Sequence, residues 1–253
     1  MTIAWGAIVI GDEIMSGKRQ DKHMAQVIRT LASRGLELAW CEHVGDDPGR
    51  ITASLARYFA SEDVVFSFGG IGATPDDHTR ACAASAAGVE LCLHPEAEAE
   101  IRSRFGAETT PQRLAMGEFP LGARIIPNPY NRIPGFSMGS VYFLPGFPEM
   151  AWPMMEWVLD TNYSQLFSPG AIAERAIIVR GAGESQLIDL MRRCGERYPG
   201  LKVFSLPRMA PHDRHIELGV RGDAARVPLA IEELQSGVSA LGFVWAEARV
   251  EIR

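Results

Sequence analysis

The chain has 253 residues, of which 47% are apolar and 22% are charged, so it can form a sizeable core and is not intrinsically disordered. Its net charge of −6 argues against a protein that binds nucleic acid through a basic surface. Because an acidic chain repels phosphate, a phosphate site in it would need backbone amides or a metal ion.

The amino-terminal segment predicts a strand rather than a signal peptide, because no Lys or Arg precedes the short apolar run of MTIAWGAIVI. No segment reaches the roughly 18 consecutive apolar residues that a membrane span needs. The four cysteines lie far apart, at positions 41, 82, 92 and 194, and this predicts reduced thiols. We therefore expect a cytoplasmic protein that does not contact a membrane.

The first 90 residues alternate between strand and helix patterns. Continuous apolar runs predict buried strands at 4–10, 36–43 and 63–68. Between them, helices are predicted around 24–31, from Asp47-Pro48 onwards, and from Thr74-Pro75 to residue 87. This order is typical of an α/β fold with a parallel sheet between helices, and it places functional residues at the carboxyl ends of the strands.

The remainder of the chain changes its pattern twice. Residues 88–122 are weakly helical, and strands at 124–127 and 141–144 precede an apolar helix that ends near 159. Residues 160–171 have no period, so we predict two domains, 1–162 and 170–253. The second domain has the order βαββαβ of a small α+β fold, with strands at 174–180, 201–206, 215–220 and 243–252.

The segment FGGIGATPDDHT, from Phe68 to Thr79, is the most informative part of the sequence. Its glycines let the backbone turn sharply and approach a ligand, and the helix behind them offers free amides to a phosphate. It is neither a Walker A loop, since no Gly-Lys-Ser/Thr follows, nor a dinucleotide fingerprint, since the spacing differs. The predicted phosphate-binding residues in this segment are Gly69, Gly70, Gly72, Thr74 and Thr79.

Two aspartates, Asp76 and Asp77, follow these glycines. A purely structural interpretation is available, because Thr74-Pro75-Asp76-Asp77 is also a good helix start with Thr74 as the N-cap. Two carboxylates beside a phosphate are repulsive, however, unless a divalent cation lies between them. We therefore predict that Asp76 and Asp77 bind Mg²⁺ or another divalent cation, with helix capping as the alternative.

Other acidic loops should meet residues 69–79, which we call the glycine loop. The reason is that the carboxyl ends of parallel strands share one edge of the sheet. The first strand is followed by Asp12, Glu13 and Ser16, and Asp21 begins the next helix. Asp46 follows the second strand, where Asp47 is predicted to be only a helix N-cap. The residues predicted to surround one cleft are Asp12, Glu13, Asp21, Asp46, Asp76 and Asp77.

Four motifs in this order resemble a known family: GDEIMSG at 11–17, VGDDP at 44–48, GGIGATPDDHT at 69–79 and LPGFPEM at 144–150. They look like the molybdopterin-binding fold and resemble most the amino-terminal part of the competence/damage-inducible protein A (CinA) family. The resemblance covers about residues 3–160 and implies a three-layer αβα fold with a mostly parallel sheet. Residues 170–253 look like the small domain that follows in that family, without its deamidase domain.

The resemblance also implies a chemistry. Asp46 and Asp77 correspond to two aspartates associated with metal-assisted nucleotidyl transfer in related adenylyltransferases, and they are the predicted catalytic residues. The glycine loop, together with Pro145 and Gly146, would bind a pterin phosphate or a nucleotide pyrophosphate. The CinA branch implies Mg²⁺-dependent hydrolysis of ADP-ribose. The alternatives are a non-catalytic molybdopterin- or nucleotide-binding module and a molybdopterin adenylyltransferase. Proteins of this fold usually form homo-oligomers, so a dimer or trimer is expected.

Three segments depart from the family pattern. The usual Gly-Pro of the glycine loop is Gly72-Ala73, and the usual Asp-x-Asn after the first loop is Asp21-Lys22-His23. A Gly-Thr-Ala-Pro-Gly segment typical of the family is replaced by Asn131-Arg-Ile-Pro-Gly135. The first two departures lie beside the predicted site, so they leave the choice of substrate open.

Overall fold

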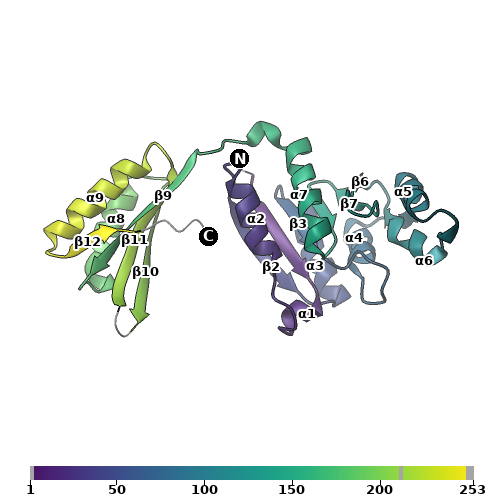
Figure 1. Cartoon of the computed structure of the whole chain (residues 1–253), viewed down its shortest axis with the longest axis horizontal. Coiled ribbons are helices and arrows are strands. Elements are labelled where there is room, and N and C mark those ends of the chain that lie inside the picture. The colour runs from purple at the N-terminus through teal and green to yellow at the C-terminus, as the bar shows by residue number, and fades with distance from the viewer. Residues whose placement is uncertain (1–2, 211–212, 249–253) are drawn as a thin grey trace. The chain divides into compact units, whose positions relative to one another are not determined.

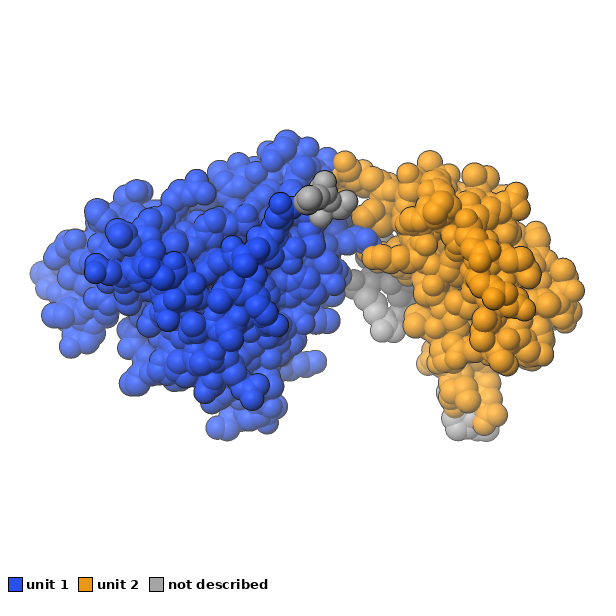
Figure 2. All heavy atoms as spheres, turned by 180° about the vertical axis from the view of Figure 1, so that it is seen from behind, with its two compact units in different colours: residues 1–32, 36–167 blue, residues 33–35, 168–253 orange. Residues whose placement is uncertain are grey.

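A computed structural model describes residues 3–210 and 213–248. The chain folds into two compact units, which Figure 2 draws in blue and orange. Unit 1 comprises residues 1–32 and 36–167, and unit 2 comprises residues 33–35 and 168–253. Each unit has its own hydrophobic core.

The centre of unit 1 is a six-stranded sheet in the order β2-β1-β3-β8-β7-β6. The strands β2, β1, β3 and β8 are parallel, and β7 and β6 complete the sheet through antiparallel pairing. The sheet is therefore mostly parallel, as predicted. Its strands are β1 (Trp5–Ile10), β2 (Leu38–Val44), β3 (Val64–Phe68), β6 (Arg124–Ile126), β7 (Gly135–Met138) and β8 (Val141–Leu144).

Helices cover both faces of this sheet (Figure 1). Alternate residues of β1 point to opposite faces, so Ala7 and Val9 pack with α2 (His23–Ala32) and α7 (Pro148–Asn162). Ile8 and Ile10 pack on the other face with α3 (Pro48–Phe59), α4 (Thr79–Ala87) and α5 (Pro95–Phe105). The predicted three-layer αβα architecture is confirmed.

Shorter elements connect this framework. A small two-stranded sheet pairs β4 (Leu91–Leu93) with β5 (Glu118–Pro120), within the region where only weak helix was expected. Strand β7 was not predicted, because it is short and begins directly after Pro134. The remaining short helices are α1 (Asp12–Met15), η1 (Gly106–Glu108), α6 (Pro111–Leu114), η2 (Ala115–Gly117) and η3 (Ser164–Leu166).

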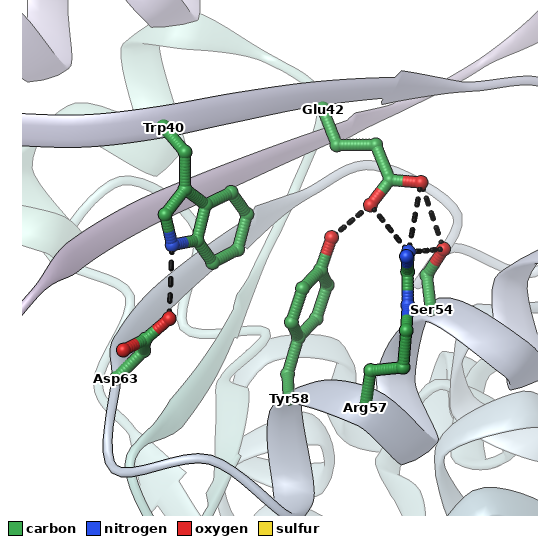
Figure 3. A network of polar contacts seen from close by, with 6 residues as sticks. All are labelled: Trp40, Glu42, Ser54, Arg57, Tyr58 and Asp63. Atoms are coloured by element: carbon green, nitrogen blue, oxygen red, sulfur yellow. Dashed lines mark hydrogen bonds and ion pairs between the residues drawn. The ribbon is translucent and has the colours of Figure 1, made fainter.

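A polar network fixes the edge strand β2 to α3 (Figure 3). The carboxylate of Glu42 accepts hydrogen bonds from Ser54 Oγ at 2.9 Å, from Arg57 Nη2 at 3.0 Å and from the Tyr58 hydroxyl. The Trp40 ring stacks on Tyr58, with centroids 4.6 Å apart. Burial and the neighbouring Glu42 raise the pKa of Tyr58, so its hydroxyl remains a donor. The network therefore fixes the position from which the loop after β2 begins.

Unit 2 has the predicted βαββαβ order and an antiparallel sheet, β10-β11-β9-β12. One face of this sheet packs on α8 and α9 through a separate core. The predicted last strand, 243–252, is observed as β12 (Val244–Glu247), and residues 249–252 lie outside the described residues. The other elements are β9 (Ile172–Arg180), α8 (Glu184–Arg197), β10 (Lys202–Ala210), β11 (Asp213–Asp223) and α9 (Val227–Ala240).

All four cysteines are unpaired, and Cys82 and Cys194 are buried whereas Cys92 is exposed. Among the residues that the structure describes, there is no helix with the length and apolarity that crossing a membrane requires.

Candidate functional site

The loops after β1, β2, β3 and β8 meet at one edge of the sheet and line a cavity of about 420 Å³. A loop between β6 and β7 closes another side of this cavity. The sequence-predicted residues that line it are Glu13, Asp46, Gly69, Gly70, Gly72, Thr74, Asp76, Asp77, Pro145 and Gly146. We call this cavity the acidic cavity.

The loops after β1 and β2 are joined by a reciprocal pair of hydrogen bonds. The Asp12 amide donates to Asp46 Oδ2 at 2.9 Å, and the Asp46 amide donates to Asp12 Oδ1 at 3.1 Å. A Cβ at Gly45 would lie 2.4 Å from Asp12 Oδ1, so the pair requires glycine there. Asp12 itself does not line the acidic cavity. Its carboxylate positions the backbone that carries Asp46.

The carboxyl group of Asp46 lies in a negative environment. Partial burial raises its pKa, and the carboxylates of Asp12, Glu13 and Asp76 raise it further, against the opposing effect of the Asp12 amide. The Asp76 side chain, in the same cavity, is exposed. Four carboxyl groups, those of Glu13, Asp46, Asp76 and Asp77, therefore line one cavity.

The glycine loop is held in place by Thr79. Its amide donates to the Gly70 carbonyl at 3.0 Å, and its hydroxyl donates to the Gly69 carbonyl at 3.1 Å. Gly69 and Gly70 have φ values of 103° and 68°, in the left-handed region that favours glycine. The Thr79 side chain is fully buried and does not line the acidic cavity, so its observed contacts support the loop.

The predicted start of the helix after the glycine loop is wrong. Helix α4 begins at Thr79 rather than near Thr74, and no side-chain hydrogen bond caps it. Thr74 does not cap a helix; its amide and its hydroxyl both donate to Asp77 Oδ2, the amide at 2.8 Å. Asp76 and Asp77 thus belong to a turn before the helix. The capping alternative for these two aspartates is therefore wrong.

Arg80, which was not among the predicted site residues, links two walls of the acidic cavity. Its guanidinium donates to the carbonyl of Gly72 in the glycine loop and to the carbonyl of Ala115, beside the cavity residue Met116. The side chain is only 8% exposed. Its position directly after DDHT could have suggested a role at this site. Its partner Ala115 is 35 residues away in the sequence, however, so the contact itself could not be predicted.

Two further predicted residues, Ser16 and Asp21, do not line the acidic cavity. Asp21 accepts hydrogen bonds from the amides of His23 and Met24, at 2.7 Å and 3.2 Å, and so caps the start of α2. Its Oδ2 also lies 3.1 Å from His43 Nε2. Ser16 lies at the exposed end of α1, where its amide donates to the Asp12 carbonyl.

His23 supports the loop that follows β8. Trp152 Nε1 can only donate, so its 3.3 Å contact with His23 Nδ1 requires that nitrogen to be unprotonated. The proton is then on Nε2, which donates to the Gly146 carbonyl at 3.1 Å. The ring also stacks on Phe68, with centroids 4.4 Å apart, and burial lowers the pKa of His23. A neutral histidine therefore positions Gly146.

The stability of unit 1 should depend on pH through His23. Because its pKa is lowered in the folded state, its stabilising contribution is complete above the ordinary value of 6.5 and is lost as pH falls towards the lowered value. We expect His23→Asn to lower the thermal midpoint at pH 7.5 and to reduce its fall between pH 7 and 5. Thermal unfolding at several pH values measures both. Parallel pH profiles for the two proteins would contradict the assignment.

Several other residues that line the acidic cavity were not predicted. They include the basic residue Arg19 after α1 and two amides, Asn128 and Asn131, in the loop between β6 and β7. The apolar ones are Ile10, Ile71, Ala73, Met116, Ile133, Pro134, Phe147 and Met150. For the loop between β6 and β7, the only sequence feature that could have indicated a site was its departure from the family segment at 131–135.

The donor set of the acidic cavity suits a cation shared with a ligand. Within residues 3–210 and 213–248, no three His, Cys, Asp or Glu side chains form a group that could hold a metal ion by itself. Mg²⁺ commonly takes one or two carboxylates and completes its shell with phosphate and water oxygens. A cation held by Asp76 and Asp77 would therefore need further oxygens from a ligand such as a phosphate.

Comparison with known proteins agrees with this architecture. A family model described as a probable molybdopterin binding domain matches residues 6–164. A protein from Caldivirga maquilingensis is 31% identical over 246 residues, covering 90% of this chain and 94% of that protein. A CinA-like protein from Desulfosudis oleivorans is 31% identical over 204 residues, covering 77% of this chain and 49% of that protein. The chain thus spans about half the length of that CinA-like relative.

A solved structure extends the comparison to the fold. The protein CinA from Thermoplasma acidophilum, described as having unknown function, superposes with a TM-score of 0.57 at 30% identity. The match covers 62% of this chain and 98% of that one. The family model spans the sheet and all four loops of the acidic cavity. The chain therefore belongs to the molybdopterin-binding domain family, as a CinA-like member.

Proposed function

We propose that this protein hydrolyses a nucleotide phosphoanhydride with the help of Mg²⁺, and that ADP-ribose is its substrate. The observation that carries the proposal is that the carboxylates of Asp46, Asp76 and Asp77 line the same cavity as the glycines of the glycine loop. A carboxylate beside a phosphate site suits a general base, and two adjacent carboxylates suit a cation that the phosphate also contacts.

In the proposed reaction a water oxygen forms a bond to one phosphorus of the pyrophosphate, and the bridging P–O bond breaks. The products are AMP and ribose 5-phosphate. Asp46 accepts the proton of the attacking water, and the glycine loop holds the phosphates close to its backbone. Asp76 and Asp77 would hold Mg²⁺, which offsets the charge of the pyrophosphate. Arg19 adds a positive charge at the cavity wall.

The proposal is tested by incubating the protein with ADP-ribose, FAD and related dinucleotides in the presence of Mg²⁺ or Mn²⁺. We expect AMP and ribose 5-phosphate from ADP-ribose, with no product when the divalent metal is chelated. Chromatography of the nucleotides measures the outcome. Absence of product from every substrate and metal would overturn the hydrolase.

A second candidate is a non-catalytic binding module or a molybdopterin adenylyltransferase. The family's description, which names molybdopterin binding, favours it. Binding of a pterin without metal dependence or turnover would support the module. Transfer of AMP from ATP to a pterin phosphate would support the transferase.

We also propose a homo-oligomer, dimer or trimer, in the cytoplasm. Light scattering coupled to size-exclusion chromatography tests the oligomeric state, and a monomer at micromolar concentration would contradict it.

A further inference from the structure

The loop between β6 and β7, residues 127–134, is fixed by its own side chains. Asn128 is buried, accepts a hydrogen bond from the Tyr130 amide at 3.0 Å and donates to the Ile133 carbonyl at 2.9 Å. Both ends of its amide are therefore used within the loop. Asn128 is a structural residue of this wall, although it faces the acidic cavity.

Asn131 lies in the same loop but uses its amide differently. Its Oδ1 accepts a hydrogen bond from the Ile133 amide at 2.9 Å, which closes a local turn. Its Nδ2 contacts Met150 Sδ at 3.1 Å. A thioether sulfur is a weak acceptor, and Nδ2 carries two donors. The N–H donors of Asn131 Nδ2 therefore have only a weak acceptor, the Met150 sulfur, and can donate to a ligand in the cavity.

The next residue fixes the position of Asn131. Arg132 has a φ of 64°, which is uncommon for a residue other than glycine. Its Nε donates to Glu100 Oε2 on α5 at 2.8 Å, and its amide donates to the Asn128 carbonyl at 3.0 Å. Unfavourable backbone conformations of this kind persist where surrounding contacts impose them, and they concentrate at ligand sites.

Apolar residues also line the acidic cavity, and two of them, Ile133 and Met150, contact Asn131. Ile133, Met150 and Phe147 line the same cavity, and Phe147 is 56% exposed although it is a large aromatic residue. An exposed aromatic ring offers a face on which a planar ring can stack. The glycine loop and the aspartates of this cavity suit the phosphate part of a ligand, whereas these residues suit a flat, mostly apolar part.

We propose that Asn131 Nδ2 donates a hydrogen bond to an acceptor atom on the heterocyclic ring of the ligand, a purine or a pterin, and that Asn131 thereby selects the ring. Phe147 and Met150 supply the apolar surface for that ring. The inference rests on one part of the proposed function, namely that the phosphate of the ligand binds at the glycine loop. It does not require hydrolysis.

The experiment measures equilibrium binding by calorimetry, with Mg²⁺ present, for three probes. AMP carries a purine, 6-hydroxymethylpterin carries a pterin, and inorganic pyrophosphate carries no ring. The variants are Asn131→Ala and Asn131→Asp. The aspartate keeps the acceptor for the Ile133 amide and removes the donor, so it separates ring recognition from the local turn. Asn162→Ala, at the exposed end of α7, is the matched control.

We expect Asn131→Ala to weaken the binding of the ring that the wild type binds, AMP or the pterin, by about 3- to 10-fold and to leave pyrophosphate binding within about twofold. Asn131→Asp should weaken ring binding at least as much as Asn131→Ala does. Because the new carboxylate also repels pyrophosphate, the loss of ring binding should exceed the loss of pyrophosphate binding. Asn162→Ala should change neither.

Three results would overturn the proposal: recovery of ring binding in Asn131→Asp, equal losses for ring and pyrophosphate in Asn131→Ala, or a wild-type protein that binds neither ring. A wild-type protein that binds AMP but forms no product from ADP-ribose would overturn only the hydrolase.

Discussion

Replacing Asp46 by asparagine is expected to lower the turnover of ADP-ribose by about 10²- to 10⁴-fold, the usual contribution of a general base. The substitution removes the proton acceptor but keeps an oxygen that can accept the hydrogen bond from the Asp12 amide. The amide of residue 46 can still donate to Asp12 Oδ1. The cavity should therefore keep its shape, and the loss should fall on kcat, as steady-state kinetics would measure.

The same substitution should not destabilise the protein at neutral pH. The pKa of Asp46 is raised in the folded state, first by burial and then by Asp12, Glu13 and Asp76. A carboxyl group with a raised pKa stabilises the fold at low pH, and this contribution is lost as pH rises through the folded value. Asp46→Asn should therefore keep or raise the thermal midpoint at pH 7.

Asp47 supplies the matched control, because it is the next residue and has a purely structural role. Its Oδ1 accepts a hydrogen bond from the Arg50 amide at 2.8 Å and caps α3. Asp47→Ala should cost about 1 kcal/mol of stability and leave kcat unchanged. If Asp46→Asn instead lowers the thermal midpoint as Asp47→Ala does and spares kcat, Asp46 is structural and the proposed role fails.

The sheet and the position of the acidic cavity could be predicted because both depend on local patterns. Apolar runs mark the buried strands, and parallel pairing then brings the residues after β1, β2, β3 and β8 to one edge. Asp46 and Asp77 were placed in one cavity by this reasoning alone. No long-range contact had to be known.

The start of α4 could not be predicted, because two local preferences compete there. Thr74-Pro75 is a strong helix-start signal, yet Thr74 donates to Asp77 and the chain turns before the helix. What fixes the start is Thr79, through its hydrogen bonds to Gly69 and Gly70. Arg80 and Asn131 were missed for a related reason, since their partners Ala115 and Met150 are distant in sequence.

Replacing Gly70 by alanine should destabilise unit 1 by about 2–5 kcal/mol and weaken pyrophosphate binding. The left-handed conformation at a φ of 68° costs an alanine about 1–2 kcal/mol. The added Cβ would also lie 2.1 Å from Thr79 Oγ1, and overpacking of this kind costs about 1–3 kcal/mol. Thr79 cannot move aside easily, because it is buried and its hydroxyl donates to Gly69.

Gly88, at the end of α4, separates these two costs. It also has a φ of 68°, but a Cβ there would have no neighbour within 4 Å. Gly88→Ala should therefore cost only the conformational part, about 1–2 kcal/mol, and leave pyrophosphate binding unchanged. Urea unfolding followed by tryptophan fluorescence suits the comparison, because Trp5, Trp40, Trp152 and Trp157 all lie in unit 1.

A double variant then identifies the atom responsible. Thr79→Ala removes the hydroxyl that the new Cβ would overlap, so Gly70→Ala should cost less in the Thr79→Ala background than in the wild type. That non-additivity is expected of two residues in direct contact. Equal costs of Gly70→Ala in both backgrounds would mean that backbone conformation alone requires glycine at position 70. Thr79 would then support the glycine loop only through its hydrogen bonds to Gly69 and Gly70.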